Sequence, residues 1–175
     1  VGEYASANDD QAFARYCCWA FSQSELVRAN NVVVIEPGAS LEDECLAKIL
    51  NSVQESCGRS VSSDRFRIWI DESVDGGCNT GVIITDDEFF YFKGGCGVCF
   101  KLADITSVDW ERNSGGCIYI NGIKCNFLVN SRKPFVDTFK KVLKFREKVM
   151  TADEQEMNVM PSAGFTIEAD VDGRW

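Results

Sequence analysis

The sequence predicts an α+β protein: a seven-stranded antiparallel barrel or sandwich capped by a C-terminal helix, with an N-terminal helical region. Between residues 66 and 129, short runs rich in β-branched and aromatic residues recur roughly every eight to twelve residues. On either side, apolar residues recur at helical spacing instead. We expect a mainly helical region at 1–62 packing on the barrel, a β-rich domain at 63–150 and an acidic tail at 151–175.

Two helices are predicted before the β-rich domain. Asn8 is a suitable N-cap for the first, because two aspartates follow it where the helix dipole favours negative charge. Ser40 followed by Asp43 resembles a capping box for the second helix, and Gly58 supplies its C-terminal stop. A short β-like run at 32–35 separates the two helices.

Seven β-rich runs follow: FRIWI, GVIIT, EFFYF, VCFKL, TSVDW, CIYI and IKCNFLV. Asn121-Gly122 between the last two runs predicts a hairpin, since both residues tolerate the positive φ of a type I′ turn. The consecutive aromatics Phe89–Phe92 place two side chains on each face of their strand. A further layer, which the N-terminal helices could supply, must therefore cover the outer pair.

A last helix is predicted from Pro134, which suits a first helical turn. Its apolar stripe consists of Phe135, Val136, Phe139, Val142, Leu143, Val149 and Met150. We expect Phe139 and Leu143 to be buried against the barrel. The opposite face carries Lys140, Lys141, Lys144 and Lys148. This lysine face is either solvated or a binding surface for an acidic segment, which could be the chain's own tail around 153–156 or part of a partner.

Charge is unevenly distributed along the chain. The net charge is −9, but residues 131–148 carry seven basic and two acidic side chains, +5 in total, so the rest sums to −14. Such a balance is unfavourable for a nucleic-acid-binding protein. An acidic surface favours a protein partner, and a basic one if that surface does the binding; the alternative is that acidity only maintains solubility.

The chain contains no histidine, which excludes Ser-His-Asp and Cys-His catalysis and histidine metal ligands. No nucleophile–base pair can be identified from the sequence, so we expect a protein that is not an enzyme and needs no cofactor. No segment resembles a signal peptide or a membrane span. With nine cysteines, an odd number, these observations predict cytoplasmic location, free thiols and no membrane insertion.

The stretch GGCGVCF at 94–100 places Cys96 and Cys99, with two residues between them, in a glycine-rich turn. A structural zinc site needs four ligands, and the only further candidates are Cys78, Cys117 and Cys125, none in a second Cys-x-x-Cys. A redox pair is favoured at a helix start, whereas this pair precedes a strand. The preferred interpretation is a hairpin tip, and zinc and redox roles are alternatives.

An acidic loop, DESVDGGCNTG, carries Asp71, Glu72 and Asp75. It lacks the residue spacing of a calcium-binding EF-hand. Because these carboxylates cluster at one turn, they are candidate partner-binding residues together with the lysine face.

The sequence pattern of residues 70–124 resembles that of bacterial pleckstrin-homology-like (PH-like) domains. The matching positions are Gly81–Asp86, the aromatic strand Phe89–Phe92 and Asp104-Ile105, and the similarity covers about residues 66–149. The resemblance implies a seven-stranded scaffold for protein or lipid-surface contacts, with no catalytic residues. Phosphoinositide-binding PH domains use basic residues in the first strand–loop–strand region, whereas the loop here is acidic, so headgroup binding there is not expected.

Two functions therefore compete. The first is a non-enzymatic PH-like protein-interaction module. The alternative is an acidic inhibitor or immunity-type protein that binds and neutralises a basic toxin, nuclease or other effector.

Overall fold

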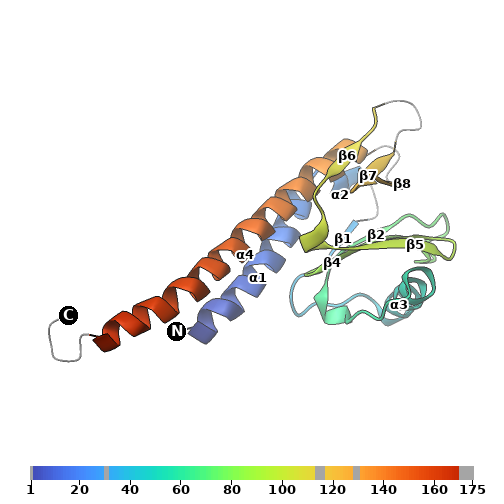
Figure 1. Cartoon of the computed structure of the whole chain (residues 1–175). Helices are drawn as coiled ribbons and strands as arrows, with labels where there is room; N and C mark the ends of the chain where they lie inside the picture. Colours follow the sequence, from blue (N-terminus) through green and yellow to red (C-terminus); the bar gives the residue numbers. More distant parts are fainter. Residues whose placement is uncertain (1, 30–31, 113–116, 128–130, 170–175) are drawn as a thin grey trace.

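The computed structural model describes the backbone of residues 2–29, 32–112, 117–127 and 131–169. Side chains are described within 11–27, 32–112, 117–127 and 131–151. The described residues form two antiparallel sheets and four α-helices, two of which project side by side from the body (Figure 1). None of the described helices is long and apolar enough to cross a membrane.

The first sheet is a five-stranded meander in the order β1-β2-β3-β4-β5. Its strands are β1 (Val32–Val34), β2 (Phe66–Asp71), β3 (Thr80–Thr85), β4 (Glu88–Lys93) and β5 (Cys96–Lys101). The β4–β5 turn uses Gly94-Gly95, both at positive φ (57° and 80°), a conformation that glycine adopts without steric cost.

The second sheet contains β6 (Val108–Trp110), β7 (Ile118–Ile120) and β8 (Ile123–Cys125), paired in that order. Asn121 and Gly122 join β7 to β8 at φ 51° and 77°, which confirms the predicted hairpin.

The predicted mixed α+β class is confirmed, and each of the seven β-rich runs overlaps one of the strands β2–β8. The last two residues of the final run, 128–129, lie outside the described residues. The structure does not confirm the predicted closed barrel, because the described strands form two separate sheets. Two features account for this. The short strand β1 occupies the outer edge of β2, and the strands of the second sheet are only three residues long, so they offer little edge for pairing.

The helices differ from the prediction mainly at their starts. Helix α1 (Gly2–Gln23) begins before Asn8, so the predicted N-cap at Asn8 is wrong; a four-residue helix α2 (Leu26–Ala29) follows. Helix α3 (Asp43–Cys57) begins three residues after Ser40, and Glu42 is its N-cap without a side-chain cap bond, so the capping box is also wrong. Gly58 ends α3 at φ 65°, as predicted.

Helix α4 (Arg132–Ala169) includes Pro134 in its first turn, as predicted. It continues in one piece through residues 151–169, into the segment expected to be a tail. Two 3-10 turns, Ser63–Arg65 and Leu102–Asp104, complete the regular structure.

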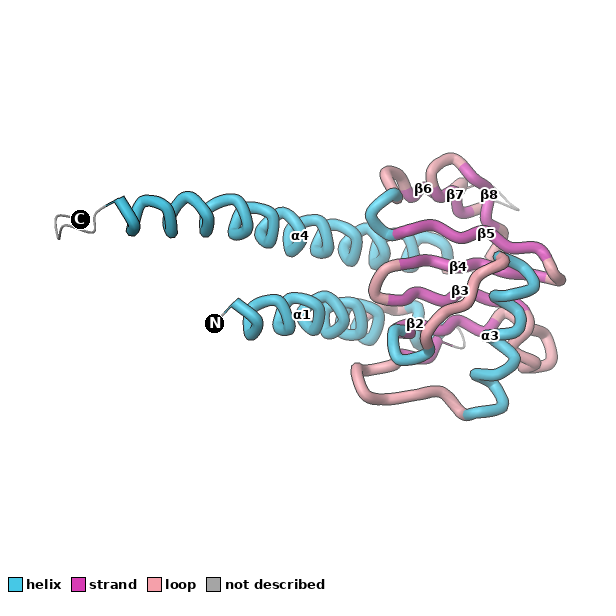
Figure 2. The backbone as a smooth tube through the Cα atoms, turned by 60° about the horizontal axis from the view of Figure 1, so that its bottom comes forward, coloured by secondary structure: helices cyan, strands magenta, loops and turns pink. Residues whose placement is uncertain are grey.

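The five-stranded sheet is buried on both faces (Figures 1 and 2). Phe89 and Tyr91 pack with α1, α4 and the second sheet, whereas Phe90 and Phe92 pack under α3. The alternation follows from the period of two in a strand. An N-terminal helix, α3, therefore supplies the covering layer that the aromatic run requires.

The apolar stripe of α4 packs on the first of these cores. Phe135, Val136, Phe139 and Val142 are buried, which confirms the prediction for Phe139. Leu143 is only half-buried and Met150 is exposed, so the stripe emerges from the core after its third turn.

A disulfide joins Cys45 of α3 to Cys78 in the β2–β3 loop. The expectation of free thiols is therefore wrong for this pair, which only the tertiary packing of α3 on the sheet brings together. The remaining cysteines keep their thiols: Cys17, Cys18, Cys57, Cys96, Cys99, Cys117 and Cys125.

Replacing Cys45 and Cys78 by alanine is expected to lower the free energy of unfolding by about 2–4 kcal/mol, because the bond restrains the unfolded chain. The two residues are 33 positions apart. Urea unfolding of the oxidised protein and the double variant measures the difference. The control is Cys96→Ala at an exposed thiol, which should leave the urea midpoint nearly unchanged. Equal stability of the double variant and the parent would mean that the bond contributes nothing.

Candidate functional site

A groove of about 880 Å³ lies between α4 and the segment Leu102–Asp109, which connects the two sheets. The segment is held in place at both ends. The Leu102 amide donates to the Asp87 carbonyl oxygen at 2.7 Å, and the Asn121 side chain spans the other end. Asn121 Oδ1 accepts from the Thr106 and Ser107 amides at 2.8 and 3.2 Å, and its Nδ2 donates to the Asp104 carbonyl at 2.9 Å. This wall of the groove is therefore preformed.

The groove combines an apolar floor with a charged rim. Ile105 and Leu143 are half-buried there, and Met150 is 46% exposed at the end of the groove. The charged lining residues are Lys140, Lys144, Arg146, Asp109 and Glu147, three cations against two anions. Such a mixture is typical of a surface that binds a polypeptide segment rather than a small, fully enclosed ligand.

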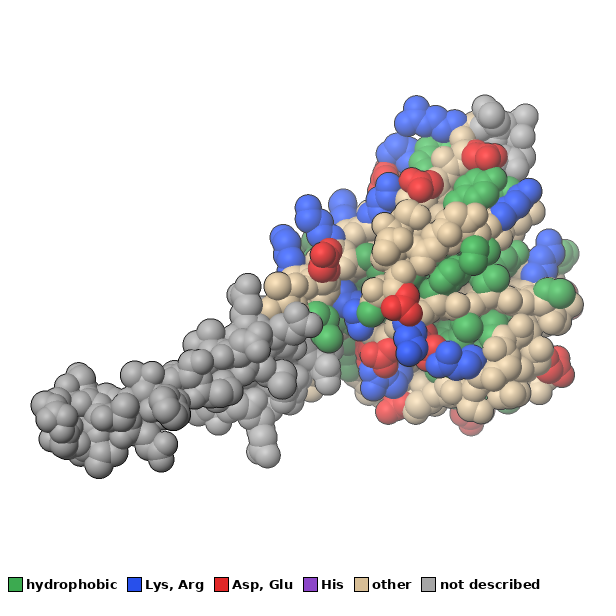
Figure 3. All heavy atoms as spheres, in the orientation of Figure 1, with side chains coloured by type: hydrophobic (Ala, Val, Ile, Leu, Met, Phe, Trp, Pro, Cys, Tyr) green, Lys and Arg blue, Asp and Glu red, His purple; other side chains and the backbone are tan. Residues whose placement is uncertain are grey.

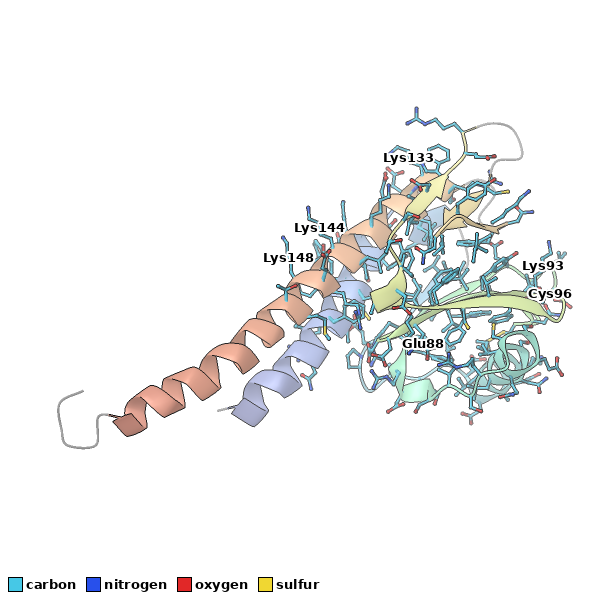
Figure 4. All side chains as sticks on the ribbon, viewed as in Figure 1. Glu88, Lys93, Cys96, Lys133, Lys144 and Lys148 are labelled. Atoms are coloured by element: carbon cyan, nitrogen blue, oxygen red, sulfur yellow. A yellow bond between two sulfur atoms is a disulfide. The ribbon has the colours of Figure 1, made fainter. Side chains whose placement is uncertain are left out.

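The four predicted lysines are exposed along α4, as expected. Lys140, Lys144 and Lys148 follow one another at intervals of four and so form a strip, of which Lys140 and Lys144 line the groove. Figure 4 shows Lys144 and Lys148 extending from the same side of α4, and Figure 3 shows basic side chains gathered along this helix.

Within the described residues, none of these four lysines forms an ion pair within 4.0 Å. By contrast, Lys133 in the first turn of α4 pairs with Asp137 at 2.6 Å. The strip is therefore an accumulation of cations whose charge is open to an external partner.

Two carboxylates of the acidic loop accept hydrogen bonds from the loop itself. Asp71 Oδ1 accepts the Ser73 amide at 2.9 Å and the Ser73 hydroxyl, and Asp75 Oδ1 accepts the Gly77 amide at 3.0 Å. These are side-chain turns, in which the carboxylate replaces a backbone acceptor. The structure thus gives two of the three predicted partner-binding carboxylates a local structural role.

Glu72 and Asp75 also line a smaller hollow of about 480 Å³, with Lys93 at its margin. Val74 at the loop tip is fully exposed. This hollow lies at the other end of the β4–β5 hairpin from the basic groove, where Figure 4 labels Lys93. The structure therefore does not bring the acidic and lysine candidates into one site.

Cys96 and Cys99 do not form a ligand pair. Both lie on β5 three residues apart, so their side chains extend from opposite faces of the strand, with Cα atoms roughly 10 Å apart. Cys96 is exposed after the Gly94-Gly95 turn and Cys99 packs against the α3 side. The preferred interpretation as a hairpin is thus confirmed.

The other cysteine candidates are elsewhere. Cys78 is bonded to Cys45, and Cys117, just before β7, and Cys125 of β8 are buried. Among the described residues, no three His, Cys, Asp or Glu side chains converge as a metal site would require.

An ion pair that the sequence did not predict joins Arg67 of β2 to Asp86, which follows β3. Arg67 is 6% exposed and donates from Nε and Nη2 to both oxygens of Asp86, at 2.8 and 2.9 Å. It also donates to the carbonyls of Phe66 and Asp64 at 2.8 and 3.0 Å. Burial raises the pKa of Asp86, and the Arg67 hydrogen bonds oppose that rise.

The pair lines neither the groove nor the smaller hollow, and its hydrogen bonds join β2 to the turn between β3 and β4. Its surroundings include the buried thiol of Cys17, whose pKa burial also raises. The sequence signal was weak: an arginine inside an otherwise apolar strand, and an aspartate just after the next strand.

Comparison of the chain with protein-family models, with curated proteins and with solved structures finds no match.

Proposed function

We propose that this protein is a non-enzymatic protein-interaction module whose binding surface is the groove between α4 and Leu102–Asp109. The partner is an acidic polypeptide segment that carries at least one apolar side chain. The observation that carries the proposal is the combination of an apolar floor, Ile105 and Leu143, with lysines that have no ion-pair partner among the described residues.

The chemistry of the rim favours a polypeptide over a nucleic acid. Asp109 and Glu147 lie among the cations, so a continuous phosphate backbone would meet repulsion within the groove. The net charge of −9 adds a general repulsion of polyanions. An acidic peptide can instead place its carboxylates at Lys140 and Lys144 and its apolar side chain on the floor.

The chain's own tail is not the proposed occupant. Residues 153–156 continue α4 beyond the groove, and a continuous helix cannot fold back onto its own lysines. The partner is therefore another molecule.

The PH-like assignment belongs to this proposal. Its support is the order of the elements, seven strands in meanders followed by a helix, and the sequence resemblance over 66–149. Under this assignment the acidic β2–β3 loop takes the place of the basic loop of lipid-binding relatives, so the interaction is with protein.

The test uses a display library of random 15-residue peptides. We expect the enriched peptides to be acidic and to contain leucine, isoleucine or phenylalanine. Lys140→Glu with Lys144→Glu should weaken their binding by about tenfold or more and leave the melting temperature nearly unchanged, because both lysines are exposed. Fluorescence anisotropy and thermal unfolding measure the two effects.

The matched control is Lys93→Glu with Lys124→Glu, which changes the net charge equally on exposed residues that do not line the groove. It should retain binding. Binding that survives the α4 reversal, or a library that yields no acidic peptides, would refute the proposed surface.

The inhibitor alternative is favoured by a different observation. Exposed carboxylates gather at the start of α3, where Glu42, Asp43 and Glu44 lie, on the side of the sheet opposite α4. Enrichment of basic peptides whose binding is insensitive to the α4 lysines would support this alternative.

A cytoplasmic location is proposed with the module. The Cys45–Cys78 bond argues against this location, because reducing cytoplasm keeps most thiols unpaired, and so makes the proposal testable. Thiol trapping in intact cells should then find Cys45 and Cys78 reduced; a fully oxidised pair would indicate an oxidising compartment.

A further inference from the structure

The C-terminal end of α3 lies directly on the edge strand β5. Cys57, the last residue of α3, points its sulfur at the backbone of this strand, with Sγ 3.7 Å from the Val98 carbonyl oxygen. A Cβ placed on Gly97 would lie 2.7 Å from the same sulfur. The Cys57 side chain therefore occupies the space that a side chain at position 97 would take.

Cys99 is the next residue of β5 on that face. Gly97 is paired with Phe92 and Cys99 with Phe90, and both phenylalanines face α3. Cys57 and Cys99 are both half-buried against this core. Burial raises the pKa of Cys57 to about 11, and the nearby Cys99 sulfur contributes to the rise. Both thiols thus face the contact between the C-terminal end of α3 and β5, while the Cys45–Cys78 bond holds the other end of the helix.

We propose that Cys57 and Cys99 are a second disulfide-forming pair, closed by a low-molecular-weight disulfide such as oxidised glutathione. One cysteine loses its proton, and its thiolate attacks a glutathione sulfur, which forms a mixed disulfide and releases one glutathione thiolate. The second cysteine's thiolate then attacks the protein sulfur of the mixed disulfide and releases the second glutathione. The two thiols are oxidised, one glutathione disulfide is reduced, and the two released thiolates take up the two protons.

The closed bond would fasten α3 to the sheet at both ends. Because the thiolate is the attacking form and the pKa of Cys57 is raised, oxidation is expected to be slow at pH 7 and faster toward pH 9. The site lies on the opposite side of the sheet from the α4 groove, so this inference does not depend on the proposed function.

The experiment uses the full chain treated with oxidised glutathione, followed by alkylation, trypsin digestion without reduction and mass spectrometry. Cys96 and Cys99 fall in one tryptic peptide, residues 94–101, and Cys57 in another, 49–59. The Cys96→Ser variant therefore removes the ambiguity, and Cys96 is exposed, so its replacement should leave the fold intact.

We expect the 49–59 and 94–101 peptides to be linked in Cys96→Ser after oxidation, and hydrogen exchange in the last turn of α3 to slow. In Cys99→Ala, with Cys96 present, the link should be absent. A link that persists in Cys99→Ala would make Cys96 the partner. No link in oxidised Cys96→Ser would leave Cys57 and Cys99 as separate thiols. Either result overturns the proposal.

Discussion

Phe139→Ala is expected to lower the free energy of unfolding by about 3–5 kcal/mol. Phe139 is fully buried, and its ring centroid lies 5.4 Å from those of both Phe89 and Phe135. The ring thus joins α4 to the five-stranded sheet, and its removal leaves a cavity at a junction that a rigid helix cannot close. Urea-induced unfolding, with fluorescence and circular dichroism as probes, measures the loss.

The matched variant is Leu143→Ala, one turn further along the same helix. Leu143 is only half-buried and lines the groove, so we expect a smaller cost of about 1–2 kcal/mol. A larger loss at Leu143 than at Phe139 would mean that the wrong face of α4 has been assigned to the core.

Arg67→Met is expected to destabilise the protein by about 2–4 kcal/mol, because it leaves the partly buried Asp86 carboxylate without its charge partner. The Phe66 and Asp64 carbonyls lose their bonds from the guanidinium as well. Methionine fills much of the space of the arginine side chain, so the loss reports on charge and hydrogen bonding more than on packing.

The double variant Arg67→Met with Asp86→Leu provides the control. It removes both charges, so it should recover a large part of the stability that the single change loses. If the double variant is as unstable as the sum of its single variants, Arg67 acts through its carbonyl contacts and not through Asp86. Chemical denaturation of all four proteins completes the thermodynamic cycle.

The parts of the fold that the sequence predicted well are those set by local backbone preference. Asn121-Gly122 adopts the positive φ angles of the predicted turn, and Gly58 ends α3 in the left-handed region, because few other residues tolerate these conformations. The seven β-rich runs became strands, since alternating β-branched and aromatic residues suit a pleated, buried surface.

Helix starts were predicted less well. Asn8 and Ser40 are both good N-caps in isolation, yet α1 begins before Asn8 and α3 begins after Ser40. A cap contributes only about 1 kcal/mol, so packing can move the start of a helix at little cost.

The candidate site was half predicted. The lysines of α4 could be placed on the outer face by their spacing alone, and they are exposed there. Their neighbours across the groove could not be predicted, because the segment Leu102–Asp109 is positioned by hydrogen bonds to residues distant in the chain, Asp87 and Asn121. The sequence does not distinguish the three carboxylates of the acidic loop as partner-binding candidates. In the structure, Asp71 and Asp75 accept hydrogen bonds from their own turn.

By itself, the sequence determined the α+β composition, the β7–β8 turn, the apolar stripe of α4 and its lysine face. All of these depend on residues within a few positions of one another, through backbone conformation and the periods of helix and strand. Only the tertiary structure decided which cysteines meet, that Arg67 pairs with Asp86, that the sheets stay open and that α3 covers Phe90 and Phe92. These features join residues far apart in the chain, and their partners are chosen by how the layers pack, which no local pattern encodes.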